Sequence, residues 1–281
     1  MPADRPDPEL LGRARGALLA HAAGSRLTSR GDGDGAPAAL ARQLGESLVE
    51  RGEFDASDVA RRWVQWMDRD GRGLGRTTRR ALELIETGVE PFEAGNRARD
   101  LEPAGSGAVL RCLPVALRFH DDTDRLVRAA TQQAAITHAE PKCLWAAAAI
   151  ALAVRELLHG NHYFADEVVH RLRDRAPRAV LDAMHRAARV QRDELPFAPS
   201  ISETDAVRCL EIAFWVSLHE RSLEAGLRMV TAAGGDTIGN TATAAGLLGA
   251  RDGEVAIPQA WLGLSDAAGL GGLAERLALG E

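Results

Sequence analysis

Apolar residues recur every three or four positions along most of this chain, a spacing that places side chains on one face of an α-helix. Over residues 56–67, Val59, Trp63 and Met67 follow this spacing, and Asp55 stands where a helix cap is expected. Its carboxylate can accept hydrogen bonds from the first backbone N–H groups, which lack partners inside the helix. We therefore predict a helix over residues 56–67 with one buried face.

The same periodicity predicts further helices in both halves of the chain. Residues 40–48, 207–218 and 222–233 carry apolar stripes at helical spacing. Residues 143–158 are rich in alanine and end before Gly160, a residue type that commonly stops a helix. No stretch alternates apolar and polar residues for long enough to predict a strand, and no strand is followed by a G-x-G-x-x-G motif. The pattern predicts an all-α fold and gives no support to a dinucleotide-binding sheet.

Length and composition fit one compact helical domain. The 281 residues can bury a core without disulfides, so we expect a single domain over residues 1–281, with residues 1–9 as a flexible polar tail. The three cysteines lie far apart in apolar helical contexts, as buried thiols of a reducing compartment do. No secretory signal and no apolar run long enough for a membrane span are visible. These features predict a cytoplasmic protein that does not enter membranes.

The overall charge limits the kinds of partner that the chain can bind. The net charge is −6, which argues against binding to nucleic-acid backbones. One basic run extends from Arg72 to Arg80. We interpret this run either as an anion-binding site or as the solvated end of a helix.

The segment with the most informative chemistry begins with Gly234, Gly235 and Asp236, continues with hydroxyl side chains, and then consists almost wholly of small residues to position 250. Glycines at the start of a helix let backbone N–H groups and a carboxylate face a ligand at close range. Small residues behind them let the helix pack tightly against its neighbours. We expect a ligand site mounted on a buried helix, with Asp236 either in the chemistry or as the helix cap.

Five motifs, in the same chain order, resemble those of the ADP-ribosylglycohydrolase family, which includes the dinitrogenase-reductase-activating glycohydrolases. The third reads G-S-G-A-V-L-R-C-L-P and is similar to the family's G-N-G-x-x-M-R-x-x-P; the fourth reads T-H-A-E-P and is similar to its T-H-x-x-P. In chain order the motifs are residues 13–24, 73–82, 105–114, 137–141 and 234–261. Because five weak motifs in the right order are spread over most of the chain, the resemblance covers the fold as a whole.

The resemblance implies an all-α orthogonal multi-helix bundle with a central cleft. It also implies hydrolysis of the bond between the anomeric carbon of ADP-ribose and a protein or small-molecule group. Family enzymes use two Mg²⁺ or Mn²⁺ ions held by an early T-D-D-T and a late D-x-D-T motif. Hard cations of this kind need several oxygen ligands, and they orient ribose hydroxyls and a water. The expected partners are ADP-ribose, a ribosyl small molecule or an ADP-ribosylated protein.

This chain departs from the family where the metals would be bound. Asp236 matches the first aspartate of the late motif, but Ile238 and Gly239 replace its second aspartate and its threonine. Ser25 stands where the family has an aspartate in the opening helix. A gapless placement puts Ala-Pro-Ala, residues 36–38, at the early motif. The standard two-metal site is therefore not supported by the sequence.

The carboxylates left as candidate Mg²⁺ ligands are Asp236, Asp32 and Asp34. Asp32 and Asp34 lie between glycines in a predicted loop over residues 28–37. Such a run is typical of a mobile solvated loop, although it would also let both carboxylates swing into the cleft in place of the lost early motif. The acidic run 121–124 lies outside the motif order, and we interpret it as a helix cap.

The remaining candidate residues would contact the ligand without a metal. The Gly-Ser-Gly turn of the third motif exposes N–H groups suited to a phosphate or a ribose, and Arg111 is expected to support this turn through its carbonyls. His138 is either a packing residue or, as its motif suggests, a residue that faces the ligand. The expected ligand-binding set is Gly105, Ser106, Gly107, His138, Gly234 and Gly235.

Two main functional hypotheses follow. In the first, the chain is a divergent ADP-ribosylglycohydrolase-like enzyme that hydrolyses an N- or O-ribosyl bond, with Asp236 as the catalytic carboxylate that an oxocarbenium-like transition state needs. In the alternative, it is a catalytically impaired family member that binds ADP-ribose or a nucleotide-like ligand, or a scaffold. A third reading is metal-free biosynthetic chemistry on a ribosyl compound. The number of missing oxygen ligands favours the alternative over the standard two-metal reaction.

Overall fold

The described part of the chain is built from helices. The computed structural model describes residues 7–29, 34–99, 105–195 and 205–281, and within these ranges no strand is formed. The predicted all-α fold is therefore confirmed. The α-helices are α1 (Pro8–Thr28), α2 (Gly35–Arg51), α3 (Ala56–Arg69), α4 (Arg76–Glu86), α5 (Pro91–Ala98), α6 (Leu113–Arg118), α7 (Thr123–Ala135), α8 (Pro141–Leu158), α9 (Phe164–Leu172), α10 (Arg178–Ala187), α11 (Ala206–His219), α12 (Leu223–Ala233), α13 (Thr237–Asp252) and α14 (Ala267–Leu279). The short 3₁₀ segments are η2 (Ser106–Arg111), η3 (Arg192–Glu194), η4 (Glu254–Ala256) and η5 (Gln259–Trp261).

Helix ends lie close to where the sequence places them. Asp55 caps α3 by accepting hydrogen bonds from the backbone N–H groups of Ser57 and Asp58. Helix α2 stops at Gly52, whose φ of +74° lies in the left-handed region that favours glycine. The acidic run before α7 also acts as predicted, because Asp122 caps that helix.

Two predicted boundaries need correction. Helix α1 begins at Pro8, so residues 8 and 9 of the expected flexible tail form its first turn. Helix α2 begins at Gly35, so residues 35–37 are helical although they were expected in a loop. Proline is tolerated at this point because the first backbone N–H groups of a helix have no intrahelical partner.

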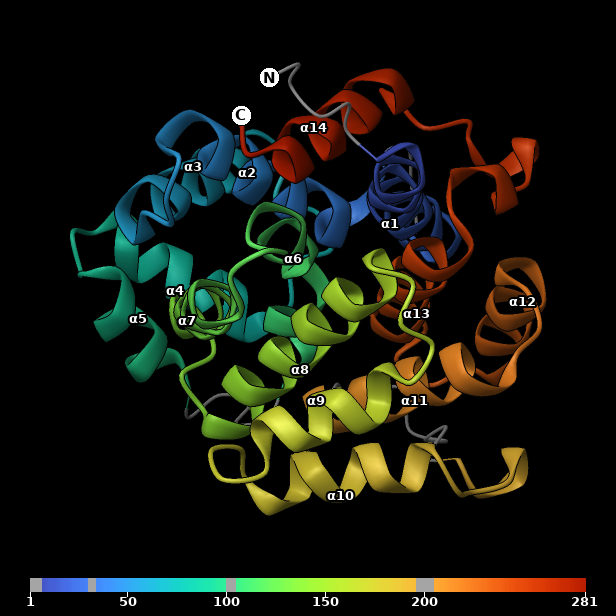
Figure 1. Cartoon of the computed structure of the whole chain (residues 1–281). Helices are drawn as coiled ribbons and strands as arrows, with labels where there is room; N and C mark the ends of the chain where they lie inside the picture. The colour runs from blue at the N-terminus through green and yellow to red at the C-terminus, as the bar shows by residue number, and fades with distance from the viewer. Residues whose placement is uncertain (1–6, 30–33, 100–104, 196–204) are drawn as a thin grey trace, which may run out of the picture.

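Helix α8 lies near the middle of the molecule, with α2 to α5 on one side and α9 to α12 on the other (Figure 1). It packs against α6, α7, α11 and α13, and its residues 146–154 are all buried. This run is mostly alanine, which lets the surrounding helices approach closely. Even so, none of the described helices is long and apolar enough to cross a membrane.

Helices α1 and α13 pack closely together, and glycines make their contact. A Cβ atom added at Gly16 would lie 2.3 Å from the carbonyl oxygen of Gly249, and one added at Gly249 would lie 2.1 Å from the carbonyl oxygen of Gly16. At the other end of the contact, a Cβ at Gly24 would lie 2.9 Å from the carbonyl oxygen of Thr241. Since backbone atoms stand in the way, only glycine fits at these positions.

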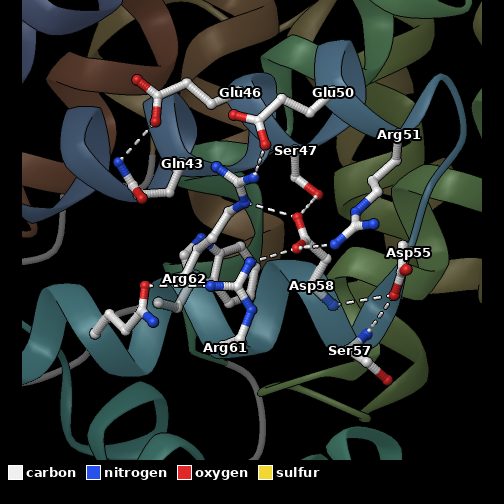
Figure 2. A network of polar contacts seen from close by, with 12 residues as sticks. Gln43, Glu46, Ser47, Glu50, Arg51, Asp55, Ser57, Asp58, Arg61 and Arg62 are labelled. Carbon is white, nitrogen blue, oxygen red and sulfur yellow. Dashed lines mark hydrogen bonds and ion pairs between the residues drawn. The ribbon is translucent and has the colours of Figure 1, made fainter.

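A buried carboxylate holds α2 against α3. Asp58 accepts hydrogen bonds from the Ser47 hydroxyl at 2.8 Å, from Arg51 at 2.8 Å, from Arg62 at 2.6 Å and from Arg61 at 2.5 Å (Figure 2). Burial alone would raise the pKa of Asp58, but these hydrogen bonds hold the pKa well below its ordinary value. The network fixes the position of α2, whose first turn forms a wall of the cleft described below.

The contact between α1 and α13 predicts that adding one methyl group lowers the free energy of unfolding at some glycine positions of α1 and not at others. We expect Gly16→Ala to lower the free energy of unfolding by about 1–3 kcal/mol, because the new Cβ collides with backbone of α13. Gly12→Ala in the same helix is the matched control, since nothing lies within 4 Å of its added Cβ. The free energy of unfolding of that control should rise by up to about 1 kcal/mol, because alanine favours a helix more than glycine does. Urea unfolding of both variants measures the difference, and equal stabilities would contradict the packing argument.

Candidate functional site

Four of the five sequence motifs meet around one hollow of about 190 Å³, which we call the Asp236 hollow. Its walls come from the first turn of α2, the segment that leads into α4, η2, the turn before α8, and the start of α13. The residues that line it are Ala36, Pro37, Leu40, Gly73, Leu74, Gly75, Thr77, Thr78, Ser106, Gly107, Leu110, Arg111, His138, Asp236, Ile238 and Gly239. The structure thus brings together Ser106, Gly107, His138 and Asp236, which are far apart in the sequence.

Hydrogen bonds to α13 and to η2 hold Asp236 in position. Its Oδ1 accepts a hydrogen bond from the backbone N–H of Gly239 at 3.2 Å, so it caps α13, and its Oδ2 accepts one from the Ser106 hydroxyl at 2.8 Å. Gly234 and Gly235 have φ of +79° and +74°, so the turn ahead of Asp236 requires glycines. These two glycines shape the turn and, like Gly105, do not line the hollow. The carboxylate therefore joins α13 to η2 at the edge of the hollow.

His138 is buried against the third motif. A Cβ added at Gly107 would lie 2.7 Å from the ring Cε1 of His138, so the glycine is needed for this close approach. The Thr137 hydroxyl accepts a hydrogen bond from Arg111 at 2.5 Å and lies 2.7 Å from His138 Nδ1. The hydroxyl can donate its own proton to Nδ1, and in that tautomer the neutral ring carries its proton on Nε2. Burial, assisted by the positive charge of Arg111, lowers the pKa of His138 to about 3.

Arg111 supports the Gly-Ser-Gly turn by hydrogen bonding to it, as expected from the sequence. Its guanidinium donates to the carbonyl of Gly107 at 2.9 Å and to the side-chain oxygen of Gln133 at 3.2 Å. It also lies 4.3 Å from the ring centroid of Trp63, which covers its face. Burial lowers the pKa of Arg111 to about 9, so the side chain stays charged at neutral pH. Arg111 is therefore a positioning residue for the turn and for His138.

Two threonines of the second motif belong to the hollow and were not among the residues expected from the sequence. Thr77 and Thr78 lie in the first turn of α4 and are buried, although threonines in the first turn of a helix are usually exposed. The Thr77 hydroxyl has no hydrogen-bond partner among the described residues. A buried hydroxyl without a partner costs free energy, so Thr77 brings an unsatisfied polar group to the wall of the hollow. Both threonines lie close to Gly73 and Gly75 in a sequence motif that resembles one of the family. This position in the motif could have identified them as site residues.

A second hollow of about 530 Å³ adjoins the first and shares with it Ala36, Pro37, Gly73 and Ile238. We call it the Asp34 hollow. Asp34 lies in its wall, where the Ser265 hydroxyl donates to its Oδ2 at 2.6 Å. The wall also contains an aromatic side chain, Trp66, and the side chains of Arg42, Gln43 and Arg72.

The described donors do not form a pair of octahedral metal sites. Where the family's metal motifs would contribute oxygen ligands, Ala36, Pro37 and Ile238 give the Asp236 hollow an apolar wall. Among the described residues, Asp236 is the one carboxylate in that wall, and Asp34 and Asp70 lie in the wall of the adjoining hollow. Asp32 lies outside the described residues. Two hard cations need more oxygen ligands than these carboxylates supply, so the described residues do not support a two-metal mechanism.

The sequence and the fold are similar to those of several known proteins. A family model described as ADP-ribosylglycohydrolase matches residues 34–281. The ADP-ribosyl-[dinitrogen reductase] glycohydrolase of Rhodospirillum rubrum is 26% identical over 228 residues, which cover 79% of this chain and 70% of that protein. An uncharacterized protein of Archaeoglobus fulgidus is 27% identical over 243 residues, which cover 83% and 76%. A solved structure described as an ADP-ribosylglycohydrolase-related protein complex matches with a TM-score of 0.78 at 27% identity, over 96% of this chain and 98% of that chain.

The buried neutral histidine predicts a pH dependence of stability. Because the pKa of His138 is lowered in the folded state, its contribution is complete above about pH 6.5 and is lost as the pH falls toward 3. In that range the unfolded chain takes up a proton that the folded chain does not. We expect His138→Gln to flatten the fall in unfolding free energy by up to about 1.4 kcal/mol per pH unit. Urea unfolding between pH 7 and pH 4.5 measures the slope.

An exposed histidine provides the control for this measurement. His185 lies on the surface of α10, so His185→Gln should leave the slope as it is in the original protein. Equal slopes in the His138→Gln variant and the original protein would show that His138 is not held neutral by burial.

Proposed function

Because this chain belongs to the ADP-ribosylglycohydrolase family, we propose that the Asp236 hollow binds the ribosyl part of ADP-ribose or of an ADP-ribosylated substrate without the family's two-metal chemistry. The observation that carries the proposal is the composition of the wall. Polar groups that suit sugar hydroxyls are kept at Thr77, Ser106, His138 and Asp236, while apolar residues stand at the expected metal-ligand positions.

The polar groups are arranged to recognise a sugar. The Asp236 carboxylate lies in the wall of the hollow and is an acceptor of the kind that binds ribose hydroxyls. The Nε2–H group of His138 and the hydroxyl of Thr77 supply donors to the same volume. Because buried tertiary contacts hold His138 and Asp236, little conformational entropy is lost when a ligand binds.

The adjoining Asp34 hollow supports an extended ligand over a free ribose. Arg42 and Arg72 lie in its wall, where Arg42 pairs with Glu46 and Asp266 and Arg72 pairs with Asp70, and Trp66 offers an aromatic surface. A diphosphate needs cationic groups, and an adenine ring stacks on aromatic side chains. An ADP-ribosyl group that occupied both hollows would place its ribosyl end beside Asp236 and its nucleotide in the larger space.

Hydrolysis is the second candidate, and the position of Asp236 favours it. A carboxylate next to the anomeric carbon could stabilise an oxocarbenium-like transition state or accept a proton from an attacking water. In this reading Asp236 is the catalytic residue, and the bond that breaks joins ribose to a nitrogen or oxygen leaving group. Mg²⁺ binding by Asp236 together with Asp34 and Asp32 stays a prediction, since it depends on residues 30–33.

Replacing the carboxylate while keeping the cap tests the proposal. Asparagine caps a helix as well as aspartate does, so Asp236→Asn should fold normally. We expect ADP-ribose to raise the melting temperature of the original protein, and its affinity to fall at least tenfold in the variant, because a charged acceptor of sugar hydroxyls is lost. Thermal shift and calorimetric titration with ADP-ribose measure both effects.

The matched control is Asp55→Asn, which alters the cap of α3 outside both hollows and should bind as the original protein does. Failure of ADP-ribose to bind the original protein would overturn the proposal. Equal affinity in Asp236→Asn would show that the carboxylate does not contribute to ligand recognition.

A further inference from the structure

Two histidines and an aspartate meet outside both hollows. His120 and Asp121 lie in the turn between α6 and α7, and His159 lies directly after the last residue of α8. One potential ligand atom from each lies within 4.8 Å of the others. The side chain of His120 is buried, whereas Asp121 and His159 are exposed, so solvent reaches the cluster. No role for these residues follows from the cleft or from the motifs.

The distances in the cluster match the spacing of ligands around one metal ion. His120 Nδ1 lies 3.4 Å from His159 Nε2 and 3.0 Å from Asp121 Oδ1. Ligand atoms bound at about 2.0–2.1 Å to a tetrahedral zinc ion lie about 3.3 Å apart. An ion bound here would replace the 3.4 Å contact between the two ring nitrogens, the contact of His120 with Asp121, and the 3.4 Å contact of His159 Nε2 with the carbonyl oxygen of His120.

The second nitrogen of His120 is already held as it is in metal sites. Its Nε2 lies 2.9 Å from the carbonyl oxygen of Ala278, which can only accept, so Nε2 carries a proton. In the neutral ring the lone pair then lies on Nδ1, which faces Asp121 and His159. A backbone carbonyl that fixes the tautomer of a ligating histidine is a common feature of zinc sites.

The ends of three helices add negative potential at the same place. Helices α6 and α8 end next to these residues, and Ala278 lies in the last turn of α14. Carbonyl groups at a helix C-terminus carry partial negative charge and favour a nearby cation. The cluster therefore combines two nitrogen ligands and one carboxylate with the C-terminal ends of three helices, and the nearby positive charge of Arg155 opposes part of their field.

We propose that His120, Asp121 and His159 form a binding site for one divalent ion of the zinc class, with water as the remaining ligand. Imidazole ligands suit zinc, copper and nickel, whereas Mg²⁺ prefers oxygen ligands, so this site is chemically different from a Mg²⁺ site in the cleft. The bound ion joins the turn between α6 and α7 to the end of α8. Through the bond to Ala278 it also stabilises the position of α14.

Calorimetric titration of the full chain with Zn²⁺ alone, after removal of metals with a chelator, tests the site. We expect one Zn²⁺ per chain and a melting temperature that rises with Zn²⁺ concentration. His159→Gln should lower the affinity at least tenfold, and Asp121→Asn should lower it as well. Both residues are exposed, so neither change threatens the fold. Co²⁺ bound in place of Zn²⁺ should give visible absorption that is weaker in His159→Gln.

Control variants distinguish Zn²⁺ binding at this cluster from Zn²⁺ binding at other histidines or in the cleft. His162→Gln and His185→Gln alter exposed histidines and should bind Zn²⁺ as the original protein does. Asp236→Asn should bind Zn²⁺ with the affinity of the original protein. The Zn²⁺ measurement therefore tests this site even if ADP-ribose does not bind in the cleft. The proposal is overturned if the original protein binds no Zn²⁺, or if His159→Gln and Asp121→Asn bind it with unchanged affinity.

Discussion

The close contact between α1 and α13 is the constraint on which the rest of the structure depends. Gly16 and Gly249 bring the two backbones so near that no side chain fits between them. This contact fixes the course of α13, and its first turn then places Asp236 opposite Ser106, at 2.8 Å. The small residues of α13 thus determine where the carboxylate lies, and the cleft is assembled from its N-terminal end.

The cleft combines a rigid polar frame with few of the oxygen donors that a two-metal site needs. Arg111 holds both the turn at Gly107 and the hydroxyl of Thr137, and that hydroxyl orients the neutral ring of His138. Around this frame, Ala36 and Ile238 stand where oxygen ligands would be required. In the function that we propose, this frame recognises a ribosyl group by hydrogen bonding and shape.

Much of the fold could be predicted from the sequence because helix periodicity and caps are local properties. The buried face of α3 and its cap at Asp55 are examples, and the glycine turn before Asp236 is another. The start of α2 was missed because glycine and proline suggest a loop, although the first turn of a helix tolerates both. Residues whose role arises from tertiary contact were also missed: the burial of Thr77 depends on packing around α4, and His120 meets His159 across 39 positions of sequence.

The central claim is that ligand binding in the cleft does not depend on a pair of metal ions. Calorimetric titration of the chelator-treated chain with ADP-ribose, with and without added Mg²⁺, tests it most directly. The account predicts binding with the same affinity in both conditions, within about twofold, because Asp236, Ser106, Thr77 and His138 make the contacts. Binding that appears only when Mg²⁺ is present would contradict it and would place a metal in the cleft.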